Sequence, residues 1–279
     1  LYLADMGVKG AGSSHKIGVG EPLGQFYGYI SDGLYQVSDF NYDKASGKYT
    51  LKDGIPYRGE KDKVQPGMLK FKNIDGSEDN KITEDDKTVI GNAFPKFYGG
   101  INNTFTYKDF DLSIFLTYSF GNDVLNATKL TNTRTALTNK NVLAAADWNH
   151  RWVTINKETG ALITDPEELA AANQGKTIAC FDDNGSSDNA VIHSWAVEDG
   201  SYLKLSNITL GYTFPKKIVN KIGLSKLRLY ATGNNLLTWT KYTGYDPEVS
   251  TMSNAMTAGV DFGAYPRSRS FVFGVNVAF

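Results

Sequence analysis

The chain has 279 residues, of which 41% are hydrophobic and 13% aromatic, and it carries a net charge of -1. Without a basic excess it has no electrostatic means of holding a phosphate backbone, so nucleic acid is not expected as a partner. The single cysteine, Cys180, cannot form an internal disulfide or a thiolate metal site with itself, and its role stays open.

The first predicted strand lies within residues 24–36. There Phe26, Gly28 and Ile30 alternate with Tyr27 and Tyr29, although the pattern does not indicate which face is buried.

An Asp-rich segment follows at residues 75–86, with the spacing of a twelve-residue calcium loop. Oxygen ligands at alternate positions suit a hard cation such as Ca²⁺, which would be structural and not a required cofactor. Asn80 stands where such loops carry Gly, and the last ligand is a short Asp, so an Asp-rich turn held by Asx hydrogen bonds is an equally good interpretation. The predicted ligands are Asp75, Ser77, Asp79, Lys81 (through its carbonyl), Thr83 and Asp86.

Residues 97–120 predict a hairpin of two long strands. Phe97, Ile101 and Phe105 share one face of the first strand, and large apolar residues alternate with Asp, Ser and Thr in the second. The turn near Lys108 and Asp109 is very short.

A long loop is expected at 122–200, and it contains three tryptophans. Trp148, Trp152 and Trp195 could stack on sugar faces or contact a partner protein. The favoured alternative is that they form the private core of the loop. The acidic residues of the same segment predict a solvated surface, with weak cation binding as the alternative; they are Asp165, Glu167, Glu168, Asp182, Asp183 and Asp188.

Three further strands are predicted in the last third of the chain. The first, 203–214, slips in phase near Ser206 and Asn207, which indicates a bulge. A helical turn within 215–223 leads to a strand from 226 to about 239. In the last strand Phe271, Phe273 and Val275 alternate with small or polar residues, as in a strand with one face toward lipid.

Connection lengths alternate between short and long. Turns at 108–109 and 214–224 are short, whereas loops of about 38–95, 122–200 and 240–266 are long. Outer-membrane barrels have short periplasmic turns and long extracellular loops, and aromatic residues near their strand ends. We therefore expect an all-β fold, an antiparallel transmembrane β-barrel, of which residues 1–279 form part.

Segments 20–36, 66–76, 79–124, 197–218 and 227–249, in this order, resemble the SusC/RagA family of TonB-linked outer-membrane transporters. The resemblance implies the C-terminal portion of a 22-stranded barrel in the outer membrane of a Gram-negative bacterium, with the plug domain absent from this chain. It also implies import of oligosaccharides or peptides, a SusD-like surface lipoprotein as partner, and coupling to the TonB-ExbB-ExbD complex through a missing N-terminal region.

No catalytic motif is present in the sequence. His15, His150 and His193 lack metal-ligand spacing, and neither a nucleophile elbow nor a phosphate-binding loop occurs. No catalytic or cofactor-binding residue is expected, and the chain is not expected to be an enzyme. The alternatives to an importer are a passive porin-type barrel and a soluble β-rich module that binds calcium and glycans.

Overall fold

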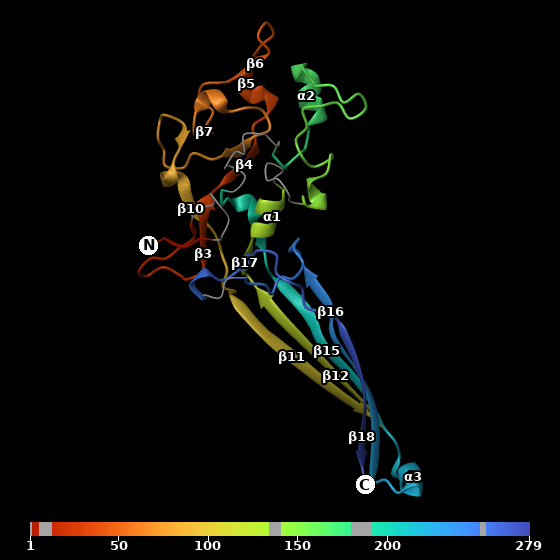
Figure 1. Cartoon of the computed structure of the whole chain (residues 1–279). Coiled ribbons are helices and arrows are strands. Elements are labelled where there is room, and N and C mark those ends of the chain that lie inside the picture. Colours follow the sequence, from red (N-terminus) through yellow and green to blue (C-terminus); the bar gives the residue numbers. More distant parts are fainter. Residues whose placement is uncertain (1, 6–12, 134–140, 180–190, 252–254) are drawn as a thin grey trace.

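The structure, a computed structural model, describes residues 2–5, 13–133, 141–179, 191–251 and 255–279. These ranges form two parts (Figure 1). One is a sheet of long antiparallel strands. The other, the loop assembly, comprises the described residues of 2–95, 122–200 and 241–266 and lies beyond one end of the sheet. The long strands are β11 (Phe97–Tyr107), β12 (Phe110–Phe120), β15 (Tyr202–Thr213), β16 (Lys226–Thr240) and β18 (Ser270–Ala278).

The remaining elements are short. The α-helices are α1 (Ala127–Asn132), α2 (Pro166–Ala172) and α3 (Lys216–Val219). The short strands are β1 (Tyr2–Asp5), β2 (Ser13–Lys16), β3 (Gln25–Tyr29), β4 (Ser31–Leu34), β5 (Phe40–Asp43), β6 (Lys48–Leu51), β7 (Tyr57–Arg58), β8 (Leu69–Phe71), β9 (Lys81–Ile82), β10 (Lys87–Asn92), β13 (Asp123–Asn126), β14 (Val197–Asp199) and β17 (Val260–Asp261).

The long strands pair in the order β11-β12-β15-β16-β18, and every neighbouring pair is antiparallel. All five match the strands predicted from alternation. β11 and β12 are joined by a two-residue turn, in which Lys108 has a φ of 54°. The predicted helical turn is also confirmed, because α3 and a 3-10 turn at Asn220–Ile222 connect β15 to β16.

The predicted bulge lies in the middle of β15. Phe115 of β12 pairs with Asn207, but the next residue, Leu116, pairs with Leu205, which leaves Ser206 as an extra residue. The Ser206 and Thr117 hydroxyl oxygens are 2.6 Å apart. The extra residue shifts the sequence phase, so one face of the sheet stays apolar on both sides of the bulge.

The loop assembly has its own hydrophobic cores. Its sheets are β1-β2-β3-β10 and β14-β13-β17, with the strand pairs β4-β8, β5-β6 and β7-β9. Phe26, Leu125 and Val260 are fully buried in one cluster, and Tyr29 and Phe71 in another. The expected long loops are therefore folded structure, although their elements are short.

The strand predicted within 24–36 is present as two short strands, β3 and β4, and belongs to the loop assembly. Phe26 and Tyr29 are both buried, so β3 has no solvated face, which is why the alternation in its sequence does not indicate a buried side. Among the helices of the described residues, none has the length and hydropathy to cross a membrane.

Candidate functional site

One face of the long sheet, the outer face, is apolar and open to the surroundings. Phe271, Phe273 and Val275 of β18 are 68%, 80% and 58% exposed, so they are not packed inside a globular core. Register continues this face across the sheet, since Val275 pairs with Leu229 and Leu229 with Tyr212. A contiguous apolar surface of this kind marks contact with a membrane or with another protein.

Aromatic rings gather at both ends of the outer face. At the end near the loop assembly, the Phe97 ring lies 5.3 Å from that of Phe120. At the opposite end, the Tyr212 ring lies 4.7 Å from Phe110 and 5.0 Å from Phe214. Apolar surface between two aromatic bands is the arrangement of strands that cross a bilayer.

The other face, the inner face, carries polar side chains that bond from strand to strand. Asn207 donates to Asn234 at 2.8 Å, Asn234 donates to Ser270 at 3.0 Å, and the Thr209 and Thr232 hydroxyls are 2.8 Å apart. On the same face, between β12 and β11, Ser113 donates to Asn102 at 3.2 Å. The polar ladder consists of Asn102, Ser113, Asn207, Thr209, Thr232, Asn234 and Ser270.

A bidentate ion pair lies on the inner face near the two-residue turn. Arg228 donates through Nε and Nη2 to the two oxygens of Asp111, at 2.9 and 2.5 Å. Gly211 of the intervening strand lies beneath this pair, and a Cβ there would overlap both side chains. A residue without a side chain is therefore required at Gly211 for the pair to span three strands.

A second charged group ties the loop assembly to the inner face. Lys204 of β15 is buried and pairs with Glu248 and with Asp246, the latter at 3.6 Å. Tyr202 donates to Glu248 at 2.8 Å. Because two carboxylates surround the lysine, its charge is compensated in spite of burial.

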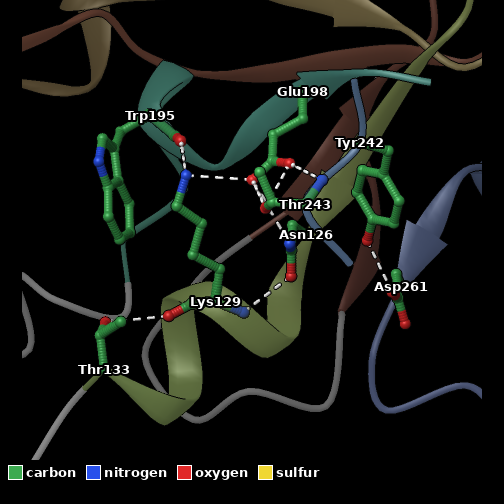
Figure 2. Close-up of polar contacts among 8 residues, drawn as sticks. All are labelled: Asn126, Lys129, Thr133, Trp195, Glu198, Tyr242, Thr243 and Asp261. Atoms are coloured by element: carbon green, nitrogen blue, oxygen red, sulfur yellow. Dashed lines mark hydrogen bonds and ion pairs between the residues drawn. The ribbon is translucent and has the colours of Figure 1, made fainter. Parts of the chain in front are cut away.

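A polar junction joins three distant segments of the loop assembly (Figure 2). Lys129 of α1 lies 3.0 Å from Glu198 of β14 and donates to the Trp195 carbonyl at 3.0 Å. Its ammonium group is 4.1 Å from the centroid of the Trp195 ring. Thr243 donates to Glu198 through its backbone N–H at 2.8 Å and through its hydroxyl. Asn126, whose side chain caps α1, also donates to Glu198 at 3.4 Å.

The polar junction also includes Tyr242, whose hydroxyl donates a hydrogen bond to Asp261 at 2.6 Å (Figure 2). Burial and the neighbouring carboxylate raise the pKa of Tyr242 above its usual value. Burial alone would raise the pKa of Glu198, but hydrogen bonds from Thr243 and Lys129 outweigh it, and the pKa lies below its usual value. The junction therefore holds Glu198 charged at neutral pH.

His193 lies beside the polar junction in a fully buried position. Its ring stacks on Trp195 with centroids 5.9 Å apart and meets the Phe71 ring edge-on. Burial and the nearby charge of Lys129 lower the pKa of His193 to about 3. The fold therefore keeps this imidazole neutral.

The three tryptophans of the sequence analysis do not form one surface. Trp152 is 2% exposed and packs in a core cluster with Leu34 and Ile163, whereas Trp195 packs against the cluster around Phe26. Trp148 is half-buried, with Arg151 and Lys176 near its ring. For Trp152 and Trp195, the alternative interpretation as a private core agrees with the packing.

Trp148 and Trp152 nevertheless share a cleft of about 760 Å³. The β5-β6 hairpin also lines the cleft, through Tyr42 and Tyr49, whose rings are 4.7 Å apart. Tyr42 also donates to the Thr164 carbonyl at 3.1 Å. Aromatic and aliphatic walls with a few polar groups are typical of small-molecule and peptide sites. The cleft could not be predicted from sequence, because its walls lie about a hundred residues apart in the chain.

The Asp-rich segment uses its carboxylates on its own backbone. Asp86 is buried and accepts hydrogen bonds from the N–H groups of Ile74 and Thr83, both at 2.8 Å. Asp75 and Asp79 each accept from the N–H two residues later, as Asx turns do, and Asn80 has a φ of 56°. Among the described residues no group of three acidic, histidine or cysteine side chains is arranged to hold a metal ion. The Asx interpretation accounts for these contacts, and the calcium site stays a prediction.

The remaining candidates do not meet in one site. His15 is buried and bonds to the Ala258 carbonyl at 3.0 Å, while His150 is exposed and bonds to Asp147. Asp165 caps α2. Cys180, with Asp182, Asp183 and Asp188, lies outside the described residues.

Comparison with known proteins gives consistent results. No family model matches the chain. Over 265 residues, 93% of this chain, it is 33% identical to TonB-dependent receptor P3 of Formosa agariphila, and the match covers 22% of that receptor. It is 26% identical to TonB-dependent receptor SusC of Bacteroides thetaiotaomicron over 74% of this chain and 17% of that one.

The fold is similar to a solved structure of the RagAB peptide transporter. The TM-score is 0.53 at 21% identity, covering 91% of this chain and 23% of that one. The chain thus spans about a fifth of the length of its relatives. TonB-dependent transporters are not enzymes, which agrees with the prediction that the chain is not an enzyme. The sequence matches and the shared fold confirm the resemblance: this chain belongs to the TonB-dependent receptors of the SusC/RagA type.

Proposed function

We propose that this chain forms wall and extracellular loops of a 22-stranded β-barrel in the outer membrane of a Gram-negative bacterium. The observation that carries the proposal is the two-faced long sheet, whose outer face is exposed and apolar while its inner face carries the polar ladder. Side chains that alternate in this way suit hydrocarbon on one side and a water-filled lumen on the other.

The orientation follows from the connections. The two-residue turn at Lys108 and the α3 connection would face the periplasm, and the loop assembly, with the predicted loops of about 38–95, 122–200 and 240–266, would face the outside. The chain would be the C-terminal part of the receptor barrel. The polar junction and the Lys204 group would fix the loop assembly on the ends of the strands.

The whole receptor would import nutrients, either oligosaccharides or peptides. Its energy would come from the TonB-ExbB-ExbD complex through a region outside this chain, and a SusD-like lipoprotein would close over the loop assembly. Family membership supports these roles, and the RagAB structure that shares the fold is a peptide transporter. The cleft lined by Tyr42, Tyr49 and Trp148 would contact the substrate or the lipoprotein from the outside.

Extraction of the complete receptor tests the proposal. A protein that exposes the outer face to lipid is expected to leave the membrane fraction only in detergent, together with a surface lipoprotein. Conductance in planar bilayers without TonB would indicate a porin instead. A receptor that is monodisperse in buffer alone would refute a membrane role.

A further inference from the structure

The end of the long sheet opposite the loop assembly carries an excess of positive charge. Residues 105–112 and 212–228 contain six basic and two acidic side chains, a difference of +4. Arg228 and Asp111 neutralise each other on the inner face. The remaining lysines, here named the basic collar, are Lys108, Lys216, Lys217, Lys221 and Lys226.

The lysines of the connection between β15 and β16 are exposed. Within this fully described part of the chain, the structure shows no ion pair to any of them. Of the two acidic residues in 105–112 and 212–228, Asp111 pairs with Arg228 and Asp109 does not. The collar is therefore a cationic surface that is open to an anionic partner from outside the chain.

The α3 connection also exposes apolar side chains next to its lysines. Ile218 and Ile222, one helical turn apart, are 54% and 64% exposed. This exposure does not come from a loosely attached segment. Val219 between them is fully buried, and its carbonyl accepts a hydrogen bond from the Leu224 N–H at 3.1 Å. The fold thus holds two isoleucines outward in a defined position.

This surface continues the outer face. Phe214, whose ring packs edge-on against Tyr212 of the aromatic band, is followed directly by Pro215 and α3. Aromatic rings mark the level at which a bilayer passes from hydrocarbon to headgroups. Exposed isoleucines and lysines together, directly after that level, are the composition of an interfacial segment, with apolar groups for the acyl boundary and ammonium groups for the phosphates.

We propose that the α3 connection is a phospholipid-binding site, in which the basic collar binds headgroup phosphates while Ile218 and Ile222 enter the acyl boundary. The inference rests on the proposed membrane role of the outer face. It goes beyond that role, because it assigns a lipid contact to a connection that would otherwise lie in periplasmic water. The site would fix the vertical position of the barrel wall in the membrane.

Spin labels test the position of the isoleucines in the complete receptor, reconstituted in phospholipid nanodiscs with Cys180→Ser as background. Nitroxides are placed at Ile222→Cys, at Lys217→Cys and at Phe273→Cys, and their relaxation is compared with oxygen and with a water-soluble nickel chelate. The label at 273 is expected to be the most oxygen-accessible, the label at 222 intermediate and the label at 217 the most accessible to nickel.

The outcomes separate the two proposals. If the label at 273 reports lipid while that at 222 is as accessible to nickel as that at 217, the membrane wall stands and the lipid site is wrong. If the label at 273 itself reports water, the membrane role of the outer face fails and the lipid site with it. A label at 222 that is shielded from both reagents would indicate a protein partner and would also overturn the lipid site.

Binding of headgroups is tested with phosphatidylglycerol. Native mass spectrometry of the detergent-purified receptor is expected to show severalfold less retained phosphatidylglycerol when Lys216, Lys217 and Lys221 are changed together to glutamine. The matched control changes Lys44, Lys48 and Lys72, three exposed lysines of the loop assembly, to glutamine. Equal retention in both triple variants would overturn the role of the collar.

Discussion

Replacement of Lys129 by methionine tests whether the polar junction holds the loop assembly together. The change keeps most of the side-chain length but removes the ion pair with Glu198 at 3.0 Å, the hydrogen bond to the Trp195 carbonyl at 3.0 Å and the contact with the Trp195 ring. Glu198 then keeps Thr243 as its main partner.

The expected cost follows from burial. The Lys129 and Glu198 side chains are 23% and 11% exposed, so the pair lies between exposed pairs, worth at most about 1 kcal/mol, and buried pairs, whose disruption costs about 3–5 kcal/mol. Because Thr243 still bonds to Glu198, we expect a loss of stability between these two cases, about 2 kcal/mol. A loss of that size corresponds to roughly 30-fold more frequent local opening.

Amide hydrogen exchange of the complete receptor measures this opening. Amides of α1 and β14 are expected to exchange roughly 30-fold faster in Lys129→Met, while those of the long sheet are unchanged. Lys63→Met is the matched control, because its pair with Glu60 at 2.9 Å is exposed on both sides. Unchanged protection of α1, or an equal effect of the control, would refute the reasoning.

Three other perturbations address the remaining features. Phe273→Lys is expected to destabilise the receptor in bilayers by about 2–4 kcal/mol, whereas Val272→Lys, one residue away on the inner face, costs much less; equal denaturation midpoints would contradict the assignment of the faces. In the folded state the pKa of His193 is about 3, below its usual 6.5. The free energy of unfolding is therefore highest above pH 6.5 and decreases on acidification, by about 2 kcal/mol at pH 5. Exchange rates around His193 should show this dependence, and His193→Leu should abolish it. Asp86→Ala should speed exchange of the backbone amides that it accepts from; if calcium then slows exchange of 75–86 only in the unsubstituted protein, the predicted metal site is supported, and no effect of calcium would contradict it.

The long strands could be predicted from sequence because each must satisfy two environments at once. Leu227 and Leu229, like Phe271 and Phe273, repeat every second residue, and this period survives in the sequence without any knowledge of partners. The bulge could also be predicted, since the alternation of apolar and polar residues changes phase once, at Ser206, and is regular on both sides of it.

The loop assembly could not be predicted in the same way. Its strands have two to six residues, and several are buried on both faces, so no alternation develops. The polar junction brings Glu198 into contact with Lys129, 69 residues before it, and with Thr243, 45 residues after it. Pairing of such separate segments leaves no periodic signal in the sequence. Burial of Trp152 likewise depends on Leu34 of β4, which lies far before it in the chain, and on Leu169 of α2.

The outermost strands of the long sheet, β11 and β18, each have one long neighbour among the described residues. Their other edges present peptide N–H and C=O groups, and in hydrocarbon each of these costs several kcal/mol when left without a partner. The penalty grows with every residue that enters the bilayer. In a barrel wall of the proposed kind, insertion of this segment would therefore be cooperative with its neighbours in the receptor, and assembly intermediates would need an environment that shelters these edges until the last pairing is complete.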